Sequence, residues 1–442
     1  MDGSSHFGRE PFQSGSKPIK NMITMRLTVQ IVRLGILLTC TNAREQGWTQ
    51  WSCDDITPDL CKLHVESESF TVRSIDIKYW RYKRDEPLED PEKQISLPIV
   101  ALHGGPGWPH NYMLPLKQLA CRSASEIIFY DQAGAGKSST KKDPLPHHLL
   151  DAKYYSEEEL PALIEHWKLN KYHIIGHSWG TMLAQLYTLN VKNTTGLQSL
   201  TLAGPLSDTK SYIDAQWDEG EGNLGSLPPF VQYRIQSLEK DGAYESTEYK
   251  AITDVLTTFF SLRTAPPPDC FTKAENGVNT EIYVGMQGPS EFTFSGTLEN
   301  FNVTGRLYEI KIPVLLTHGK YDTMRPSIVK TMQKEIMLSE RKMLAHSGHV
   351  AMIDDAGLMN DVIADFLNRV ETNAFTSDRV PDVDSENMGV QEQQNREEFF
   401  RRDKFEVAAP VYTVHLLLTL CLGIIIGKIK WTCGRGGYSS IE

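Results

Sequence analysis

The sequence contains 442 residues, of which 40% are hydrophobic and 23% charged, with a formal net charge of −11. This length suffices for one large or two ordinary domains with a sizeable core, and the composition is that of a globular protein. The acidic balance argues against a general nucleic-acid-binding protein, which presents a basic face to phosphate groups, so we expect no nucleic acid partner.

The N-terminal extension, residues 1–43, ends in a stretch typical of a secretory signal. Residues 25–43, "MRLTVQIVRLGILLTCTNA", place basic residues before an apolar run and small residues after it, although Arg33 interrupts the run. The chain has seven cysteines, none of them in a CxxC pair, which removes support for a zinc ribbon. Cys53 and Cys61 flank a short polar loop, so in an oxidising compartment they either pair with one another or remain free or unrelated thiols.

Predicted strands and helices then alternate along the chain. Residues 69–84, "SFTVRSIDIKYWRYKR", alternate apolar and polar side chains as half-buried strands do. Six apolar runs that end in glycine-rich turns follow: "LPIVALHGGPG", "EIIFYDQAGAG", "YHIIGHSWG", "LQSLTLAGP", "IPVLLTHGKYD" and "RKMLAHSGH". Helices are expected over 156–168, with Ser156 and Glu159 as a capping box, and over 181–191. The pattern predicts an α/β fold with a mostly parallel, doubly wound sheet.

Between Pro205 and Ile310 about a hundred residues lack such a strand, which predicts an inserted, mainly helical cap. The expected organisation is an extension (1–43), the first part of the core (44–204), the cap (205–310), the second part of the core (311–370), a flexible stalk (371–406), a transmembrane helix (407–427) and a short cytoplasmic tail (428–442).

The segment Val407–Gly427 carries no Asp, Glu, Lys or Arg over 21 positions. A helix of about 20 residues spans the hydrocarbon core of a bilayer, so this segment predicts a single membrane span. Lys428, Lys430 and Arg435 follow it and place the tail on the cytoplasmic side. We therefore expect a type I membrane protein whose larger part is extracellular or lumenal.

A candidate nucleophile lies in "GHSWG", residues 176–180, which fits the pattern G-x-S-x-G. An apolar strand precedes Ser178 and a helix-forming stretch follows it, which is the context of a nucleophile elbow. The small residues Gly176 and Gly180 let the strand and the helix approach closely.

Serine requires a base, and the base requires an acid that orients it. Asp322 and His349 each follow a predicted strand, and the order Ser178, Asp322, His349 is the order found in α/β-hydrolases. The glycines of "LHGGPGWPH" allow backbone N–H groups to face a developing oxyanion, and Gly105 with Trp179 are the expected donors. Neither G-x-G-x-x-G nor a complete P-loop or H-E-x-x-H motif occurs, so we expect no cofactor and no catalytic metal.

Together "HGGPG" (103–107), "DQAGAGKSS" (131–139), "GHSWG" (176–180), "HGKYD" (318–322) and "SGH" (347–349) resemble the prolyl iminopeptidases of the α/β-hydrolase superfamily. The resemblance covers about residues 69–370, and residues 288–307 are similar to the tricorn-interacting aminopeptidases and related amidases of that family. Ala133 stands where the prolyl iminopeptidases usually carry arginine, which leaves strict selectivity for proline open.

The resemblance implies a serine aminopeptidase that releases the N-terminal residue of short peptides. It implies further that Glu291, in "GPSEF", binds the ammonium group of the substrate, with Asp218 and Glu219 as candidates for a second partner. The alternatives are a carboxylesterase or amidase with the same triad, and a membrane-anchored adhesion ectodomain without catalysis. Asn193 and Asn302 fit the N-glycosylation pattern. The sequence does not indicate an oligomeric state.

Overall fold

A computed structural model describes residues 52–56, 60–85, 97–122, 125–140 and 144–378. The predicted signal sequence, most of the predicted stalk and the segment Val407–Gly427 lie outside these residues. Among the helices that the structure describes, none is both long and apolar enough to cross a membrane.

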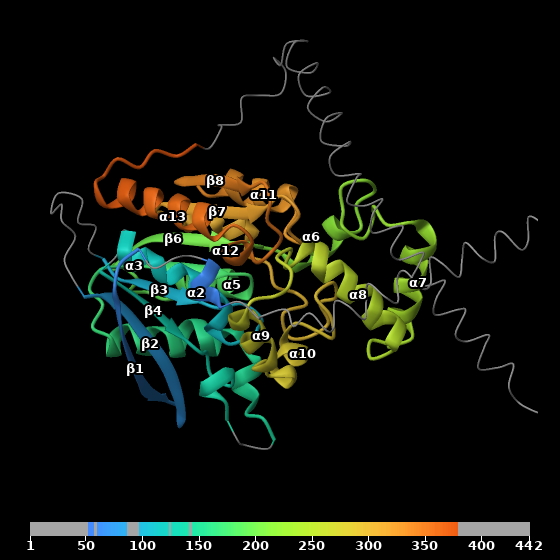
Figure 1. Cartoon of the computed structure of the whole chain (residues 1–442), viewed down its shortest axis with the longest axis horizontal. Helices are drawn as coiled ribbons and strands as arrows, with labels where there is room; N and C mark the ends of the chain where they lie inside the picture. The colour runs from blue at the N-terminus through green and yellow to red at the C-terminus, as the bar shows by residue number, and fades with distance from the viewer. Residues whose placement is uncertain (1–51, 57–59, 86–96, 123–124, 141–143, 379–442) are drawn as a thin grey trace, which may run out of the picture. The chain divides into compact units, whose positions relative to one another are not determined.

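The fold is organised by an eight-stranded sheet with the order β1-β2-β4-β3-β5-β6-β7-β8 (Figure 1). The strands are β1 (Leu63–Val72), β2 (Ile75–Arg84), β3 (Ile99–Leu102), β4 (Glu126–Tyr130), β5 (Tyr172–His177), β6 (Leu197–Ala203), β7 (Val314–Gly319) and β8 (Ser339–Leu344). β1 and β2 pair antiparallel, as do β2 and β4, while the pairs from β4 to β8 are parallel. The predicted mostly parallel sheet is therefore confirmed.

The first two strands form a hairpin whose turn is Arg73 and Ser74. Both residues have positive φ, 45° and 66°, which is the conformation of the tight turns whose twist suits a hairpin. Neither residue is Asn or Gly, the residues that favour this turn, so the alternating pattern predicted strands here but not the hairpin turn between them.

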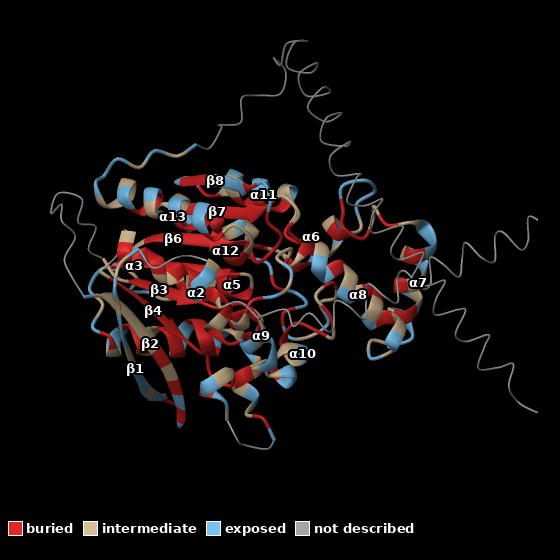
Figure 2. Cartoon of the chain, in the orientation of Figure 1, coloured by how far each residue is buried: buried red, intermediate tan, exposed pale blue. Residues whose placement is uncertain are grey.

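The central strands are buried on both faces, as their continuous apolar runs predict (Figure 2). Ile99 and Ala101 of β3 belong to one apolar cluster, which also contains residues of α3 (Leu119–Arg122) and α13 (Ala356–Glu371). Val100 and Leu102 belong to the opposite cluster, with residues of α4 (Leu160–His166), α5 (Trp179–Asn190) and α11 (Pro326–Glu335). Helices therefore cover both faces of the sheet, as in a doubly wound fold.

The interval between β6 and β7 is helical. It contains α6 (Thr209–Gln216), α7 (Pro229–Lys240), α8 (Thr247–Phe260), α9 (Asp269–Asn276) and α10 (Thr280–Met286), followed by a 3₁₀ helix (Thr304–Glu309). α7 and α8 share a small apolar cluster of their own. By contrast, Phe271 of α9 belongs to one of the two clusters of the main core and Ile282 of α10 belongs to the other. The expected cap thus has an outer part with its own core and an inner part packed on the sheet domain.

Two local expectations are wrong. Ser156 does not begin a helix: it lies inside a π-helical stretch (Tyr154–Glu159) that runs into α4, and its hydroxyl donates to the carbonyl of Ala152. Glu159 is fully buried and accepts from the N–H of Ala133 at 3.0 Å, so it makes no contact of a capping box. Burial raises the pKa of this carboxyl group to about 8. An acid thus lies beside Ala133, the position at which the family resemblance leads one to expect arginine.

The cysteines pair differently from the expectation. Disulfides join Cys53 to Cys270 and Cys61 to Cys121, with Cα atoms 5.7 and 5.6 Å apart. Cys53 and Cys61 therefore do not bond to one another, because the fold brings each of them closer to a cysteine that is remote in the sequence.

The beginning of the predicted stalk is ordered. α13 extends to Glu371, and beyond it Phe375 packs against Phe366 with ring centroids 5.5 Å apart. The Ser377 hydroxyl donates to the carbonyl of Ser339, and Asp378 accepts from the N–H of Arg341. The sheet domain therefore continues to residue 378, past the expected boundary at 370.

The remaining short helices of the described residues are α2 (Cys53–Ile56), α12 (Ala351–Asp354) and 3₁₀ helices at His110–Gln118, Gly136–Ser138 and His147–Leu150.

Candidate active site

Ser178 occupies a sharp turn between β5 and α5. Its φ of 54° and ψ of −121° are unusual for a residue with a side chain, and such backbone strain concentrates at functional sites. A Cβ atom at Gly180 would lie 2.2 Å from the carbonyl oxygen of Leu102, and one at Gly176 would lie 2.4 Å from that of Gly180. Only glycine at both positions therefore lets the helix begin directly above the strands.

His349 and Asp322 form a buried pair next to this turn. Asp322 lies in the loop after β7 and His349 in the loop after β8, and His349 Nδ1 is 2.7 Å from Asp322 Oδ1. The same Oδ1 accepts from the N–H of Met324 at 2.8 Å. His349 Nε2 has no hydrogen-bond partner among the described residues, and Ser178 and His349 line one cavity. The structure thus brings the three predicted residues together at the carboxyl ends of the parallel strands β5, β7 and β8.

The electrostatics of the pair favour an ionised acid and a basic imidazole. Burial alone would lower the pKa of His349, but the negative charge of Asp322, their hydrogen bond and the charge of Glu291 together raise it above its ordinary value. Burial alone would raise the pKa of Asp322, but His349 and the Met324 N–H lower it. An imidazole in this setting is able to accept a proton from a hydroxyl group and hold it as an ion pair.

Two neighbouring elements fix the position of His349. Its N–H donates to the carbonyl of Phe260 at the end of α8, and the N–H of Val350 donates to that of Ser261. Beneath the ring, Gly204 at the end of β6 has φ of 57°, and a Cβ atom there would lie 2.7 Å from His349 Cε1. A larger residue at 204 would displace the imidazole.

The loop after β3 lies against the nucleophile. A Cβ atom at Gly104 would be 2.9 Å from Ser178 Cβ, and Gly105 has φ of 118°, which glycine alone adopts readily. The Gly104 N–H donates to the Tyr112 hydroxyl at 2.7 Å, whereas the Gly105 N–H has no acceptor among the described residues. Trp179 is the first residue of α5, so its N–H has no partner within the helix. Both N–H groups remain available to an oxyanion.

A polar network that the sequence did not reveal connects these loops. His177 Nε2 donates to the carbonyl of His349 at 3.0 Å, which leaves His177 Nδ1 to accept from the Tyr112 hydroxyl at 2.8 Å. Burial, together with the positive charge of His349, lowers the pKa of His177 to about 3, so it stays neutral. The hydrogen bonds from Gly104 through Tyr112 and His177 to His349 fix the position of the loop after β3 (residues 103–107, the oxyanion loop) relative to the loop that carries His349.

The cavity beside Ser178 has a volume of about 490 Å³. Its walls combine Gly104, Gly105, Ser178 and His349 with residues of α8 to α10 and of the loop that carries Glu291. This size suits a small molecule or a short peptide segment. Asp218 and Glu219 are exposed and do not line this cavity, so they are not placed as partners of a bound ammonium group.

Glu291 is one of four acidic residues that line the cavity, and among these four it is the one whose charge raises the pKa of His349. The Tyr283 hydroxyl donates to its Oε2 at 3.1 Å, and the Tyr212 hydroxyl donates to its backbone carbonyl at 3.0 Å. Burial raises the pKa of Glu291, against the opposing effects of His349 and of the Tyr283 hydroxyl. A cation that entered the cavity would favour its ionised form.

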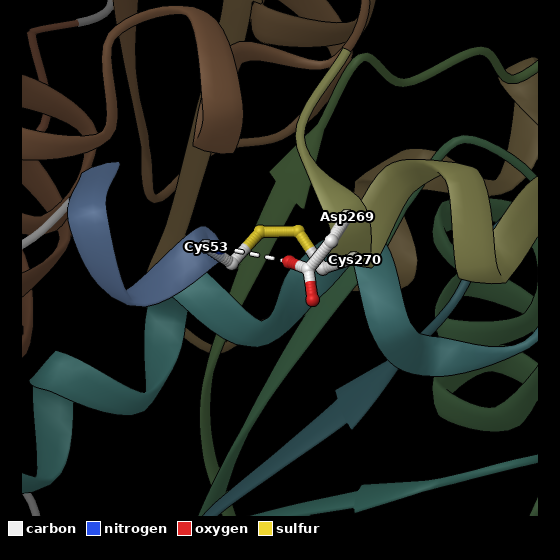
Figure 3. A group of neighbouring side chains, drawn as sticks. All are labelled: Cys53, Asp269 and Cys270. Carbon is white, nitrogen blue, oxygen red and sulfur yellow. Dashed lines mark hydrogen bonds between the residues drawn. A yellow bond between two sulfur atoms is a disulfide. The ribbon is translucent and has the colours of Figure 1, made fainter. Parts of the chain in front are cut away.

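One group of metal-ligand types occurs among the described residues: Cys53, Asp269 and Cys270 (Figure 3). The two sulfur atoms are bonded to one another in the disulfide, so they offer no thiolate to a metal ion.

Comparison with known proteins supports the fold and identifies similar proteins. Residues 98–356 match the family described as alpha/beta hydrolase fold. The chain is 35% identical over 264 residues to a proline iminopeptidase of Lactobacillus helveticus, an alignment covering 60% of this chain and 87% of that relative. It is 34% identical over 274 residues to a proline iminopeptidase of Heyndrickxia coagulans, an alignment that covers 62% of this chain and 91% of that relative.

Among solved structures, a proline iminopeptidase of Mycobacterium smegmatis has a TM-score of 0.62 and 24% sequence identity, covering 70% of this chain and 100% of that chain. The structure of VinJ has a TM-score of 0.60 and 23% sequence identity, and the match covers 69% of this chain and 99% of that chain. At these identities the likeness establishes the fold alone.

Proposed function

The chain belongs to the proline iminopeptidase family of the alpha/beta hydrolases, and on this premise we propose that it is a serine aminopeptidase that releases the N-terminal residue of short peptides. The observation that carries the proposal is the position of Glu291 in the same cavity as Ser178 and His349. An esterase has no need of a carboxylate there, whereas the free ammonium group of a peptide requires one.

The proposed reaction is acyl transfer through a covalent ester. His349, oriented by Asp322, takes the proton of Ser178 as the hydroxyl oxygen attacks the scissile carbonyl. The N–H groups of Gly105 and Trp179 stabilise the oxyanion of the tetrahedral intermediate. His349 then donates its proton to the leaving amine, and a water molecule hydrolyses the ester with His349 again as base.

The carboxylate of Glu291 is proposed to bind the ammonium group of the N-terminal residue. This contact selects substrates with a free amino group and places the first peptide bond, rather than a later one, at Ser178. The Tyr283 hydroxyl orients the carboxylate through the bond at 3.1 Å. Because Ala133 replaces the usual arginine, we do not restrict the proposal to N-terminal proline.

Replacing Glu291 with glutamine should raise KM for alanine p-nitroanilide by about 10- to 100-fold, because a hydrogen bond to a charged group contributes about 1.5–3 kcal/mol. The variant should also discriminate less between this substrate and its N-acetylated form. Steady-state kinetics on the full chain measure both effects. Glu281→Gln is the matched control. Glu281 is an exposed acid on α10 that does not line the cavity, so this variant should behave as the wild type.

The same substrates separate the alternatives. Cleavage of short aryl esters with indifference to N-acetylation would replace the aminopeptidase by a carboxylesterase or amidase. Absence of turnover on anilides and esters alike would favour the adhesion ectodomain and contradict the proposal.

The chain is further proposed to be a type I membrane protein, with its catalytic domain outside the cytoplasm and Val407–Gly427 as the anchor. Two disulfides in the described residues support an oxidising compartment. Asn193 and Asn302, the two glycosylation candidates, are both exposed.

Expression of the full chain in a eukaryotic host tests this topology. We expect endoglycosidase treatment to increase the electrophoretic mobility, with Asn193→Gln and Asn302→Gln each removing part of the shift. In sealed microsomes the catalytic domain should resist added protease. An unshifted band that protease degrades would contradict the topology.

A further inference from the structure

Helix α9 forms one wall of the cavity and is fastened at both ends. At its start, Cys270 is bonded to Cys53 of α2, and Asp269 Oδ1 accepts from the N–H of Cys53 at 3.0 Å (Figure 3). Beyond its end, the N–H of Asn279 donates to the carbonyl of Gly107 and its side-chain amide to that of Gly134. The helix is thereby aligned with the loop that carries Gly105.

Phe271, the residue next to Cys270, faces the cavity. It is buried and its ring centroid lies 5.6 Å from that of Trp108, which also lines the cavity. Trp108 follows the oxyanion loop and contacts Tyr112 edge-on, with centroids 6.0 Å apart. The Trp108–Phe271 pair thus forms an aromatic wall between α9 and the loop that approaches the nucleophile.

The position of this wall is not fixed by the helix itself. α9 has 8 residues, too few to be stable without tertiary contacts, and Pro266–Pro268 precede it. The outer helices α7 and α8 have a separate apolar cluster, so they do not share the packing that surrounds Phe271. Phe271 also packs in the core cluster of the sheet domain, and the disulfide adds a covalent link there between residues 217 positions apart.

We propose that the Cys53–Cys270 disulfide determines substrate specificity by holding Phe271 against Trp108, so that this pair contacts the side chain of the N-terminal residue; the inference rests on the proposed aminopeptidase function. Cys53 and Cys270 are positioning residues that act through Phe271. Loss of the bond lets α9 shift, which removes the apolar contact with large side chains and leaves Ser178 and His349 in place.

The second disulfide provides a matched control. Cys61–Cys121 joins the same N-terminal segment to α3, closing a separation of 60 residues, and neither cysteine lines the cavity. Removing either disulfide is expected to lower Tm, because both constrain the unfolded chain. Stability therefore does not distinguish the two bonds, whereas substrate preference does.

The test uses the full chain as wild type, Cys53→Ala/Cys270→Ala, Cys61→Ala/Cys121→Ala and Phe271→Ala. For each, kcat and KM are measured with phenylalanine and alanine p-nitroanilides, and turnover with p-nitrophenyl acetate, whose acyl group is too small to reach the aromatic pair. We expect the Cys53/Cys270 variant to lower the phenylalanine-to-alanine ratio of kcat/KM about tenfold, mainly through KM. Acetate turnover should stay within about twofold of the wild type.

Phe271→Ala should lower the ratio in the same direction, and combining it with the Cys53/Cys270 substitutions should add little, since coupled residues are non-additive. An unchanged ratio in the Cys53/Cys270 variant, or an equal change in the Cys61/Cys121 control, would overturn the proposal. If the Cys53/Cys270 variant does not fold, an unchanged ratio in Phe271→Ala, which keeps both disulfides, overturns it. A wild type that cleaves neither anilide would instead identify failure of the proposed function, and the inference would fall with it.

Discussion

Replacing Ser178 with alanine is expected to lower kcat for aminoacyl anilides by about 10⁶-fold, because the hydroxyl forms the covalent intermediate and His349 has no other group to activate. The residual rate comes from the oxyanion donors and substrate binding, which remain. Steady-state kinetics measure the loss, and a fluorophosphonate probe should label the wild type and not the variant.

The backbone at Ser178 supplies an internal control for this experiment. Because φ at this position is 54°, alanine keeps the strain, whereas glycine adopts such a conformation without a steric penalty. Ser178→Gly should therefore be as inactive as Ser178→Ala but melt at a higher temperature. Turnover of Ser178→Ala above about one per cent of the wild type would show that another residue is the nucleophile.

Asp322→Asn is expected to lower kcat about 10⁴-fold with little change in KM. The carboxylate accepts from His349 Nδ1–H at 2.7 Å and so leaves Nε2 free to act as base, whereas an amide stabilises the wrong tautomer. Asp241→Asn, at an exposed position after α7, is the control and should retain wild-type activity.

The pH profile provides a second readout of the same pair. His349 must be neutral to accept a proton, so kcat/KM falls as the pH drops through its pKa. Asp322 raises that pKa, and the acid limb of the wild type should therefore lie above the ordinary histidine value of about 6.5. In Asp322→Asn the limb should move to lower pH. A limb that stays in place would show that another group controls it.

Short sequence patterns predicted the structure correctly where the conformation depends on residues that are close together in the sequence. The glycines around Ser178 predicted the turn because they are needed for the close contact of β5 with α5, a steric requirement of five consecutive residues. The apolar runs predicted strands buried on both faces because consecutive side chains of a strand point to opposite faces, so a continuous apolar run makes both faces apolar. The order of Ser178, Asp322 and His349 predicted that these residues meet, since the ends of parallel strands share one edge of the sheet, although their catalytic roles remain a prediction.

Signals that rest on chain proximity failed. Cys53 and Cys61 are close in sequence, yet each is bonded to a more distant cysteine, because pairing depends on the distance between Cα atoms in the folded chain. Ser156 and Glu159 have the spacing of a capping box, but the helical segment begins before them, and the side chain of Glu159 is buried in the protein interior.

The sequence by itself therefore determined the α/β class, the parallel sheet and the candidate nucleophile, because sterics and burial act over a few residues. Only the tertiary structure decided which cysteines pair, that Tyr112 and His177 connect the oxyanion loop to His349, and that Phe271 reaches Trp108. These contacts join residues from different strands and helices, and their free energy is gained only after the chain has closed the long loops between them.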